Sequence, residues 1–204
     1  MSVVELNYRV LDEIWIALIR LVLEKGQEVD SELLEVNDVL IRFQQVDKNG
    51  LILLNDRRRT LVYEMQKVFF SNEPNVFGHN YHERTVGPYG RNDLGDIVQV
   101  LAEKPFSKRA TLTIFGDSNG HVPCVNIVQF LVREFQLHVT YFARGQDVYN
   151  KVYADAMCIY EMAQRVASKL DVSIGSISGL IQSAHLYLSD LPTATDTLQK
   201  HSLQ

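Results

Sequence analysis

The chain has 204 residues, of which 46% are hydrophobic and 22% charged, and its net charge is −5 with a pI of about 5.7. This length suits one globular domain with its own core, and the acidic balance gives no overall basic field for binding nucleic acid. Two cysteines are too few for a disulfide scaffold, no signal-peptide pattern opens the chain, and no run approaches the roughly 18 apolar residues that span a bilayer. We therefore expect a single cytoplasmic domain, residues 1–204, without membrane or nucleic-acid partners.

The N-terminal quarter of the sequence predicts a helix followed by a hairpin. Ser2 and Glu5 have the spacing of a capping box, an apolar stripe follows them, and Gly26 is placed to end the helix. Asn49-Gly50 is a typical hairpin dipeptide. The apolar segment 36–54 is therefore expected to form two short strands.

From residue 56 onward the pattern predicts helices and strands around one long loop. The loop, 71–93, is rich in Asn, Gly, Pro and His, and loops of this length inside a compact domain are often functional. The expected elements are a helix over 56–70, a short helix over 94–103, strands over 109–115, 122–132 and 137–143, a long helix ending near Leu170, and a last strand over 178–188. This order predicts an α+β fold, a mixed sheet packed against helices.

Asp155 lies on the apolar face of the long helix. It precedes Ile159 by four residues, and Ile159 begins a stripe that runs to Leu170. A carboxylate on such a face costs several kcal/mol unless a donor satisfies it. Because aspartate is also a favoured N-cap, the residue is either a cap or part of a site that a polar ligand completes.

Basic side chains and one cysteine lie near the ends of predicted strands. Arg144 follows strand 137–143, and Lys108-Arg109 begins strand 109–115. Each is either an ordinary surface residue or part of a phosphate site, since arginine binds phosphate through two parallel hydrogen bonds. Cys124 follows a proline at a strand start. It is either an inert core residue or, if cations lie close, a thiol whose pKa they lower.

Two patterns that contain histidine are candidate ligand sites. His185 and Tyr187 are two residues apart on the last strand and share a face, either as one side of an amphipathic strand or as two donors to one ligand. His79, His82 and Glu83 match no common zinc spacing and have no cysteine nearby in sequence. No metal site is predicted.

Together these motifs resemble the thymidylate synthase family, which includes the pyrimidine nucleotide hydroxymethylases. The resemblance runs from about Tyr89 to Tyr187 and rests on PYG (88–90), FSKRATLTI, VPC, ARGQDVY and SAHLY. Arg144 follows Cys124 by twenty residues. Cysteine, arginine, aspartate and His-x-Tyr at these separations are far more specific than any one of them alone.

The resemblance implies a role for each of these residues. Cys124 would be the nucleophile, and Glu64, in LVYEMQKVF, would be the catalytic glutamate. Lys108 and Arg109 would reach across a homodimer, formed through a face of the sheet, to the partner's nucleotide phosphate. The other substrate-binding residues that it implies are Tyr89, Arg144, Asp147, Asp155, His185 and Tyr187.

Asp155 stands where thymidylate synthases have an asparagine that recognises uracil. Asparagine donates to the uracil carbonyl and accepts from N3–H, whereas a carboxyl group only accepts, or donates once if protonated. Cytosine offers an exocyclic amine donor and an N3 acceptor, which a carboxyl group can match. In this respect the chain resembles the cytidylate hydroxymethylases, and Asp155 would act both in base recognition and in catalysis.

Other departures from the family concern the phosphate and the cofactor. Gly145 replaces the serine usually next to the phosphate-binding arginine, Lys151 stands where a glycine-containing loop approaches the base, and the early arginine is missing unless residues 57–59 replace it. The resemblance implies 5,10-methylenetetrahydrofolate as cofactor. The sequence ends 17 residues after Tyr187, without the family's C-terminal segment that closes over the folate.

The expected function is C5 hydroxymethylation of a cytidine monophosphate, with methylenetetrahydrofolate as one-carbon donor. Three alternatives remain open: folate-independent chemistry on a pyrimidine nucleotide, methylation of dUMP, and a nucleotide-binding paralogue without catalysis. The sequence does not separate ribose from deoxyribose, because the same His-Tyr pair serves either sugar.

Overall fold

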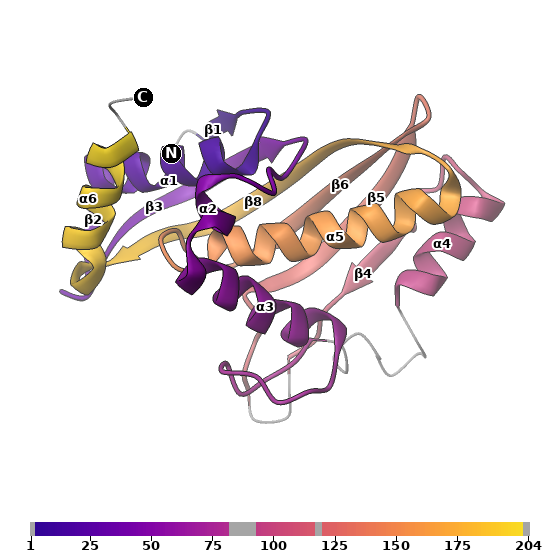
Figure 1. Ribbon diagram of the computed structural model, residues 1–204. Helices are drawn as coiled ribbons and strands as arrows, with labels where there is room; N and C mark the ends of the chain where they lie inside the picture. The colour runs from indigo at the N-terminus through magenta and orange to yellow at the C-terminus, as the bar shows by residue number, and fades with distance from the viewer. Residues whose placement is uncertain (1–2, 82–92, 117–119, 202–204) are drawn as a thin grey trace.

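A mixed sheet with helices packed on one face forms the body of the protein in the computed structural model (Figure 1). The structure describes residues 3–81, 93–116 and 120–201. The elements are β1 (Val4–Asn7), α1 (Leu11–Lys25), β2 (Gln27–Val29), β3 (Leu33–Phe43), α2 (Leu51–Leu54), α3 (Asp56–Phe70), α4 (Leu94–Glu103), β4 (Thr111–Thr113), β5 (Val125–Arg133), β6 (Gln136–Ala143), β7 (Gln146–Asp147), α5 (Val152–Leu170), β8 (Ser173–Tyr187), a 3₁₀ turn (Leu188–Asp190) and α6 (Leu191–His201).

The strands follow the order β1-β3-β8-β6-β5-β4, with β2 beside β3 and β7 beside β8. β1 runs parallel to β3, and both β6 and β7 run parallel to β8, whereas the other pairs are antiparallel. Parallel neighbours need a crossover connection, and α5 supplies it between β7 and β8. This crossover places Asp147 of β7 directly opposite His185 of β8.

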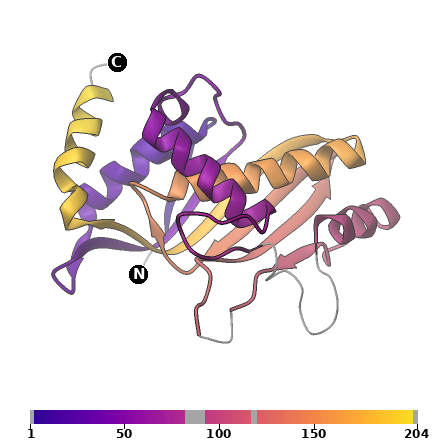
Figure 2. The same ribbon diagram turned by 60° about the horizontal axis from the view of Figure 1, so that its bottom comes forward.

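The core lies between the sheet and helices α1, α3 and α5. Phe43, Ile177, Val139 and Phe130 form one row in register across β3, β8, β6 and β5. Each of these side chains exposes 1% or less of its surface, which is worth roughly 1.5–3 kcal/mol apiece. Figures 1 and 2 show α5 lying along this face of the sheet with α3 beside it.

The opposite face of the sheet carries an exposed apolar row. Ile127, Phe142, Leu180 and Leu40 are in register across β5, β6, β8 and β3. Ile127 is 43% exposed and Leu180 36%. Since neighbouring residues of a strand point to opposite faces, this row faces away from the core.

Most of the elements predicted from residue 56 onward are confirmed. The helices over 56–70 and 94–103 have the predicted bounds as α3 and α4. The predicted strands are β4, β5, β6 and β8, although β4 is shorter and β8 begins earlier, at Ser173. The α+β class is confirmed. α6 was not predicted, and the extent of the single domain, 1–204, stays a prediction because both ends lie outside the described residues.

The prediction for the N-terminal helix was wrong about its start. The segment Val4–Asn7 is β1, and α1 begins only at Leu11. The N–H of Val10 donates to the carboxylate of Glu13 at 3.1 Å, which satisfies one donor at the true helix start. Pairing with β3 outweighed the local capping signal, and Ser2 itself lies outside the described residues.

The hairpin predicted at Asn49-Gly50 was also wrong. β3 is a strand, but the second half of the segment is the short helix α2. Asp12 of α1 is buried and accepts the N–H of Ile52 at 3.0 Å, so α1 supplies the acceptor for the first turn of α2. A four-residue apolar run cannot by itself distinguish a strand from a helical turn.

None of the helices among the described residues is long and apolar enough to cross a membrane.

Candidate active site

Cys124 lies immediately before β5, half-buried and held through its backbone. Its N–H donates to the hydroxyl of Tyr81 at 3.3 Å, and its carbonyl accepts the N–H of Arg144 at 3.0 Å. Burial raises the pKa of the thiol, and the charge of Asp155 raises it further, while Arg144 and Lys151 act in the opposite direction. The pKa of the cysteine predicted as nucleophile is therefore affected by three charged residues of the 144–155 segment: Arg144, Lys151 and Asp155.

Arg144, directly after β6, contacts the segment that carries the cysteine. Its Nη2 donates to the carbonyl of Val122 at 2.9 Å, and its Nε lies 3.2 Å from the carbonyls of both Val122 and Pro123. The guanidinium is exposed and pairs with no carboxylate among the described residues. Its remaining donors suit an anion next to Cys124.

Asp155 is buried in α5 and is not the cap of this helix. The N-cap is Lys151, and Asp155 is the fourth helical residue, 3% exposed. Its Oδ2 accepts the side-chain amide of Gln146 at 3.1 Å, whereas its Oδ1 has no hydrogen-bond partner among the described residues. Burial raises the pKa of this carboxyl from 3.8 to about 7, with Gln146 and Lys151 opposing the shift. Near neutral pH this carboxyl is therefore present in both its neutral and its ionised form, and its Oδ1 is free to accept or donate a further hydrogen bond as far as the described residues show.

Asp147 holds the turn that leads into α5. Its Oδ1 accepts the N–H groups of Tyr149 and Asn150, each at 3.0 Å, and its Oδ2 accepts the Asn150 amide at 3.3 Å. That amide also donates to Asp190 at 2.9 Å. These contacts give Asp147 a local role in the turn, and its predicted contact with substrate stays a prediction.

His185 and Tyr187 lie on β8, as predicted. Their rings make an edge-to-face contact with centroids 5.6 Å apart. His185 Nδ1 lies 3.3 Å from both the hydroxyl and the carbonyl of Ser183. The imidazole also lies close to Gly145, where a Cβ would be 3.6 Å from its Cε1. The pair is therefore beside the 144–155 segment, and its contact with a sugar stays a prediction.

Lys108 and Arg109 are exposed at the other end of β5 from Cys124. The N–H of Phe130 donates to the carbonyl of Ala110 at 2.8 Å, which fixes the position of these residues along the sheet. Cys124 precedes Phe130 by six residues, or roughly 20 Å at the rise of an antiparallel strand. Within one chain the structure does not bring these cations to the cysteine.

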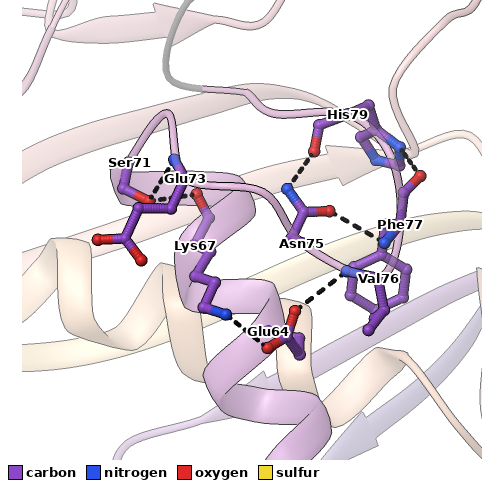
Figure 3. A network of polar contacts seen from close by, with 8 residues as sticks. All are labelled: Glu64, Lys67, Ser71, Glu73, Asn75, Val76, Phe77 and His79. Carbon is purple, nitrogen blue, oxygen red and sulfur yellow. Dashed lines mark hydrogen bonds and ion pairs between the residues drawn. The ribbon is translucent and has the colours of Figure 1, made fainter.

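Glu64, on α3, is held by two donors (Figure 3). Its Oε1 accepts the Lys67 ammonium at 2.7 Å, and its Oε2 accepts the N–H of Val76 at 3.0 Å. The Lys67 hydrogen bond, and then that of Val76, lower the pKa of this carboxyl, so that it is ionised near neutral pH. A carboxylate in this state suits proton acceptance, and its catalytic role stays a prediction.

Three polar residues contribute to this region without having been assigned a role from the sequence. They are Gln146, the donor to Asp155; Tyr81, the acceptor for Cys124; and Lys151, whose charge acts on both. Gln146 had one possible signal, since it lies inside the ARGQDVY motif, next to Asp147. Tyr81 had none, because its partner is 43 residues away.

Two predicted groups fall partly or wholly on residues that are not described. Tyr89 and the PYG motif lie outside the described residues, as do His82 and Glu83. His79 is described, and its ring lies 4.9 Å from that of His121. Among the described residues no cluster of three or more His, Cys, Asp or Glu side chains could hold a metal ion.

Residues 57–204 match the family model described as thymidylate synthase. The chain belongs to the thymidylate synthase family. The recognition drawn from its motifs is thereby confirmed, and the matched region contains every site residue discussed above. Members of this family are one-carbon transferases that bind pyrimidine nucleotides.

Curated relatives and a solved structure agree with this assignment. A protein of Methanocaldococcus jannaschii named "Putative thymidylate synthase" is 28% identical over 140 residues, which cover 62% of this chain and 63% of that protein. A protein of the same name from Methanosarcina barkeri is 23% identical over 193 residues, covering 89% of this chain and 88% of its own length. The structure of thermostable thymidylate synthase A from Bacillus subtilis matches with a TM-score of 0.65 at 16% identity, over 93% of this chain and 84% of that one.

The relatives and the solved structure support different conclusions, because they match this chain to different extents. The matched region spans 63% and 60% of the first two relatives, both named "Putative thymidylate synthase". The Bacillus structure, at 16% identity, shows the shared fold alone. The reaction and the substrate of this thymidylate synthase family member are therefore proposals.

A small cavity borders the 144–155 segment on the side of Tyr149 and Asn150. That cavity holds about 190 Å³ and is lined by Tyr149, Asn150 and Tyr153 together with Arg57 and Arg58. A larger cavity of about 670 Å³ lies between α3 and α5, and none of the predicted catalytic or substrate-binding residues lines either of these two cavities.

Proposed function

We propose that this thymidylate synthase family member modifies C5 of a cytidine monophosphate, starting with addition of Cys124 to C6. One observation carries the choice of base. Asp155 is a buried carboxyl with a pKa of about 7, its Oδ1 has no partner among the described residues, and its charge acts on the Cys124 thiol.

The hydrogen-bond pattern of Asp155 supports cytosine over uracil. Gln146 donates to Oδ2, so Oδ1 is the oxygen that carries the proton in the neutral acid. Oδ1–H then donates to N3 of cytosine, and Oδ2 has a second lone pair for the exocyclic amine. A ring nitrogen is a stronger base than a carbonyl oxygen, so cytosine N3 takes this proton more readily than uracil O4 does.

The chemistry would begin at the thiol. The Cys124 thiolate forms a bond to C6, and the electron pair of the C5–C6 double bond moves into the ring, where the proton that Asp155 transfers to N3 stabilises it. C5 thereby becomes nucleophilic and would form a bond to an electrophile, which is a proton of water in hydrogen exchange and the one-carbon unit in hydroxymethylation. Glu64, ionised and held by Lys67 and Val76, would then accept the original C5 proton through a water molecule. As the C6–S bond breaks, the C5–C6 double bond re-forms and N3 returns its proton to Asp155; in hydroxymethylation, water supplies the hydroxyl group.

The remaining predicted residues would position the nucleotide. Arg144 would bind the phosphate next to Cys124, and the pair of His185 and Tyr187 would hold the sugar. Asp147 would act mainly through the turn it fixes before α5, because its oxygens already accept hydrogen bonds from Tyr149 and Asn150.

The full reaction we propose is C5 hydroxymethylation, with methylenetetrahydrofolate as the family's one-carbon donor. A second candidate is exchange of the C5 hydrogen without folate, which needs only the thiol of Cys124, the proton on Asp155 and the carboxylate of Glu64. The two share their first steps, since thiolate addition to C6 is sufficient to labilise the C5 hydrogen.

We also propose that the protein works as a homodimer. The exposed row of Ile127, Phe142, Leu180 and Leu40 offers an apolar sheet face for a second copy. Lys108 and Arg109 lie roughly 20 Å from their own cysteine along β5. In such a dimer they would bind the phosphate in the partner's site.

Release of tritium from the C5 position tests the reaction directly. Substrates labelled at C5 (CMP, dCMP and dUMP) are incubated with the protein, with and without methylenetetrahydrofolate. We expect release from CMP or dCMP, and replacement of Cys124 by Ala should lower it at least about 10³-fold because the nucleophile is lost. Cys158→Ala, at a buried cysteine of α5, is the matched control and should retain activity.

Each outcome of the tritium-release experiment supports or refutes one of the proposed reactions. Release that requires folate supports hydroxymethylation, and release without folate supports hydrogen exchange. Release only from dUMP would replace the cytidylate proposal by a thymidylate synthase reaction. Unchanged release by the Cys124→Ala protein, or none from any substrate, would refute the proposed mechanism.

A further inference from the structure

Glu35 lies beside the predicted sugar-binding pair of β8, although no role was assigned to it from the sequence. It is directly opposite His185 on the neighbouring strand β3, and Asp147 of β7 is opposite His185 on the other side. Figure 1 shows β3 and β8 lying next to each other in the sheet. Paired residues of neighbouring strands project from the same face of a sheet. Glu35, His185 and Asp147 therefore form one row, with the histidine in the middle.

Ser183 joins the carboxylate of Glu35 to the imidazole of His185. Its hydroxyl donates to Oε1 of Glu35, and its Oγ lies 3.3 Å from Nδ1 of His185. The same Nδ1 lies 3.3 Å from the carbonyl oxygen of Ser183. Since Ser183 precedes His185 by two residues, both side chains are on the same face of β8. The three side chains are half-buried, which limits the competition of water for these hydrogen bonds.

The donors and acceptors in these contacts decide which nitrogen of His185 carries the proton. An ionised carboxylate only accepts, so the single proton of the Ser183 hydroxyl is used in the hydrogen bond to Glu35. The Oγ of Ser183 can then only accept from Nδ1, and its carbonyl oxygen is an acceptor in any case. Nδ1 therefore carries the proton and shares it between these two oxygens. In the neutral imidazole, Nε2 is left with a lone pair.

Nε2 of His185 makes no hydrogen bond with the described residues, and its surroundings suit a ligand. The ring lies beside Gly145, which directly follows Arg144, the residue expected to bind the phosphate. The ring of Tyr187 is in edge-to-face contact with it. Hydroxyl groups are the only hydrogen-bond donors on the sugar of a nucleoside monophosphate. A sugar hydroxyl is thus the donor that an unprotonated Nε2 would accept from at this place.

We propose that Glu35 and Ser183 hold the proton of His185 on Nδ1 and so keep Nε2 as the acceptor for a sugar hydroxyl of the nucleotide. The place of the proton follows from the contacts of Ser183. The identity of the donor rests on the proposed function, in which His185 and Tyr187 hold the sugar. Glu35 and Ser183 act through the histidine, so they are positioning residues and not catalytic ones.

The proposal gives the hydrogen bonds at the sugar a fixed direction. The sugar hydroxyl donates to Nε2 of His185, Nδ1 donates to Ser183, and Ser183 donates to Glu35. The lone pairs of the sugar oxygen then remain available for the hydroxyl of Tyr187. Hydrogen bonds that follow one another in this way polarise each other, so the negative charge of Glu35 strengthens the contact with the sugar.

Two-bond ¹H–¹⁵N correlation spectra test the place of the proton without any ligand, because protonated and unprotonated ring nitrogens differ clearly in chemical shift. Spectra are recorded at alkaline pH, and His185→Gln assigns the signals. We expect the Nδ1–H form in the unmodified protein. Ser183→Ala removes one acceptor, and Glu35→Gln allows the Ser183 hydroxyl to turn toward Nδ1, so both should shift His185 toward the Nε2–H form. Ser183→Thr keeps the hydroxyl and should retain the Nδ1–H form.

Titration calorimetry with CMP and dCMP tests the effect on the ligand. We expect Glu35→Gln and Ser183→Ala to raise Kd about 3–10-fold, the effect of losing one hydrogen bond. In a His185→Gln background, Glu35→Gln should change Kd less than about twofold, because Glu35 acts through the histidine.

Asp38→Asn is the matched control, a second exchange of carboxylate for amide on β3. Asp38 accepts the amide of Gln182 at 2.9 Å and has a φ of 56°, which asparagine also tolerates. It makes no contact with Ser183 or His185 among the described residues. Both the tautomer of His185 and the Kd should therefore stay as in the unmodified protein.

Three results would overturn the inference. The first is the Nε2–H form of His185 in the unmodified protein, and the second is a tautomer or a Kd that neither Glu35→Gln nor Ser183→Ala changes. The third is an equal rise in Kd by Glu35→Gln with and without His185, which would indicate an effect on the fold or directly on the nucleotide. Tritium release is measured on the same samples. Its absence, together with nucleotide binding and the expected tautomer changes, would refute the proposed reaction and leave the role of Glu35 and Ser183 standing.

Discussion

The interpretation of Asp155 from the sequence differs from its environment in the structure. On sequence alone it was either a helix cap or a member of a polar site. The structure excludes the cap, since Lys151 occupies that position, and buries the carboxyl with a single donor, Gln146. Burial of a carboxyl favours its neutral form, which explains a pKa near 7. A carboxyl with this pKa can transfer its proton to a bound nucleotide base near neutral pH. Its ionisation destabilises the folded protein.

The stability cost of Asp155 has a defined pH window. Because the folded pKa of about 7 lies above the ordinary 3.8, the folded protein binds a proton that the unfolded chain releases, and stability falls as pH rises between these values. At about 1.4 kcal/mol per pKa unit the full cost above pH 7 is on the order of 4 kcal/mol, as an upper bound. Asp155→Asn removes the titrating group. We expect it to unfold at higher urea concentration than the unmodified protein at pH 8, with the advantage decreasing as the pH is lowered and gone below about pH 4.

The matched control for this prediction is Asp171→Asn. Asp171 is exposed at the C-terminal cap of the same helix, with φ of 53°, a conformation that asparagine also tolerates. It should leave the pH dependence of urea unfolding unchanged. A parallel pH dependence in the unmodified and Asp155→Asn proteins would show that the carboxyl does not titrate in this window.

Whether a helix or strand was predicted correctly depended on whether the residues that stabilise it lie close to it in the sequence. α3 and α4 were predicted with correct bounds because each has its own cap, Asn55 for α3 and Asp93 for α4, together with an apolar stripe. β1 and α2 were missed because their stabilising partners are distant in sequence. β1 pairs with β3, and the first turn of α2 donates to Asp12, forty residues earlier.

The turn before α2 gives a test of this distant contact. A Cβ on Gly50 would lie 2.4 Å from Oδ1 of Asp12, the oxygen that accepts the N–H of Ile52. Gly50→Ala should therefore push the carboxylate away from α2 and lower the free energy of unfolding by about 1–3 kcal/mol, measured by urea denaturation. Asn49→Ala, at the exposed neighbouring position, should stay within about 0.5 kcal/mol of the unmodified protein. Equal stability of the two variants would mean that the carboxylate moves aside at no cost.

The whole molecule sets the relation between the phosphate-binding cations and the cysteine. Arg144 lies against the segment before Cys124, whereas Lys108 and Arg109 are exposed near the far end of β5. One chain therefore supplies only part of the predicted phosphate site. A dimer through the exposed row on the sheet is the arrangement that would bring a second chain's cations to it.

Mixing two inactive variants tests this arrangement. Arg109→Gln and Cys124→Ser should each lose most tritium release, but a mixed dimer has one site with an intact cysteine and an intact partner arginine. Co-expression of the two with different tags should restore about a quarter of normal release, because half of randomly paired dimers are mixed and each has one working site. Adding Leu180→Lys to both chains should abolish the recovery, since it places a charge in the apolar row.

This prediction has two clear ways to fail. High activity of Arg109→Gln by itself would show that the arginine is dispensable. No recovery in tag-purified mixed dimers, with their mass confirmed by analytical ultracentrifugation, would show that each chain uses its own cations.

The sequence by itself determined the class of fold, the elements with local signals, and the residues that identify the family: Cys124, Arg144, Asp147, His185 and Tyr187. These follow from periodicity, caps and motif spacing, all of which are local properties of the chain. Only the tertiary structure decided that Asp155 is buried beside Gln146, that Tyr81 contacts Cys124, and that Ser183 joins Glu35 to His185. Such contacts join segments separated by the sheet topology, and the pKa of a side chain depends on them because desolvation and nearby charges act through space rather than along the chain.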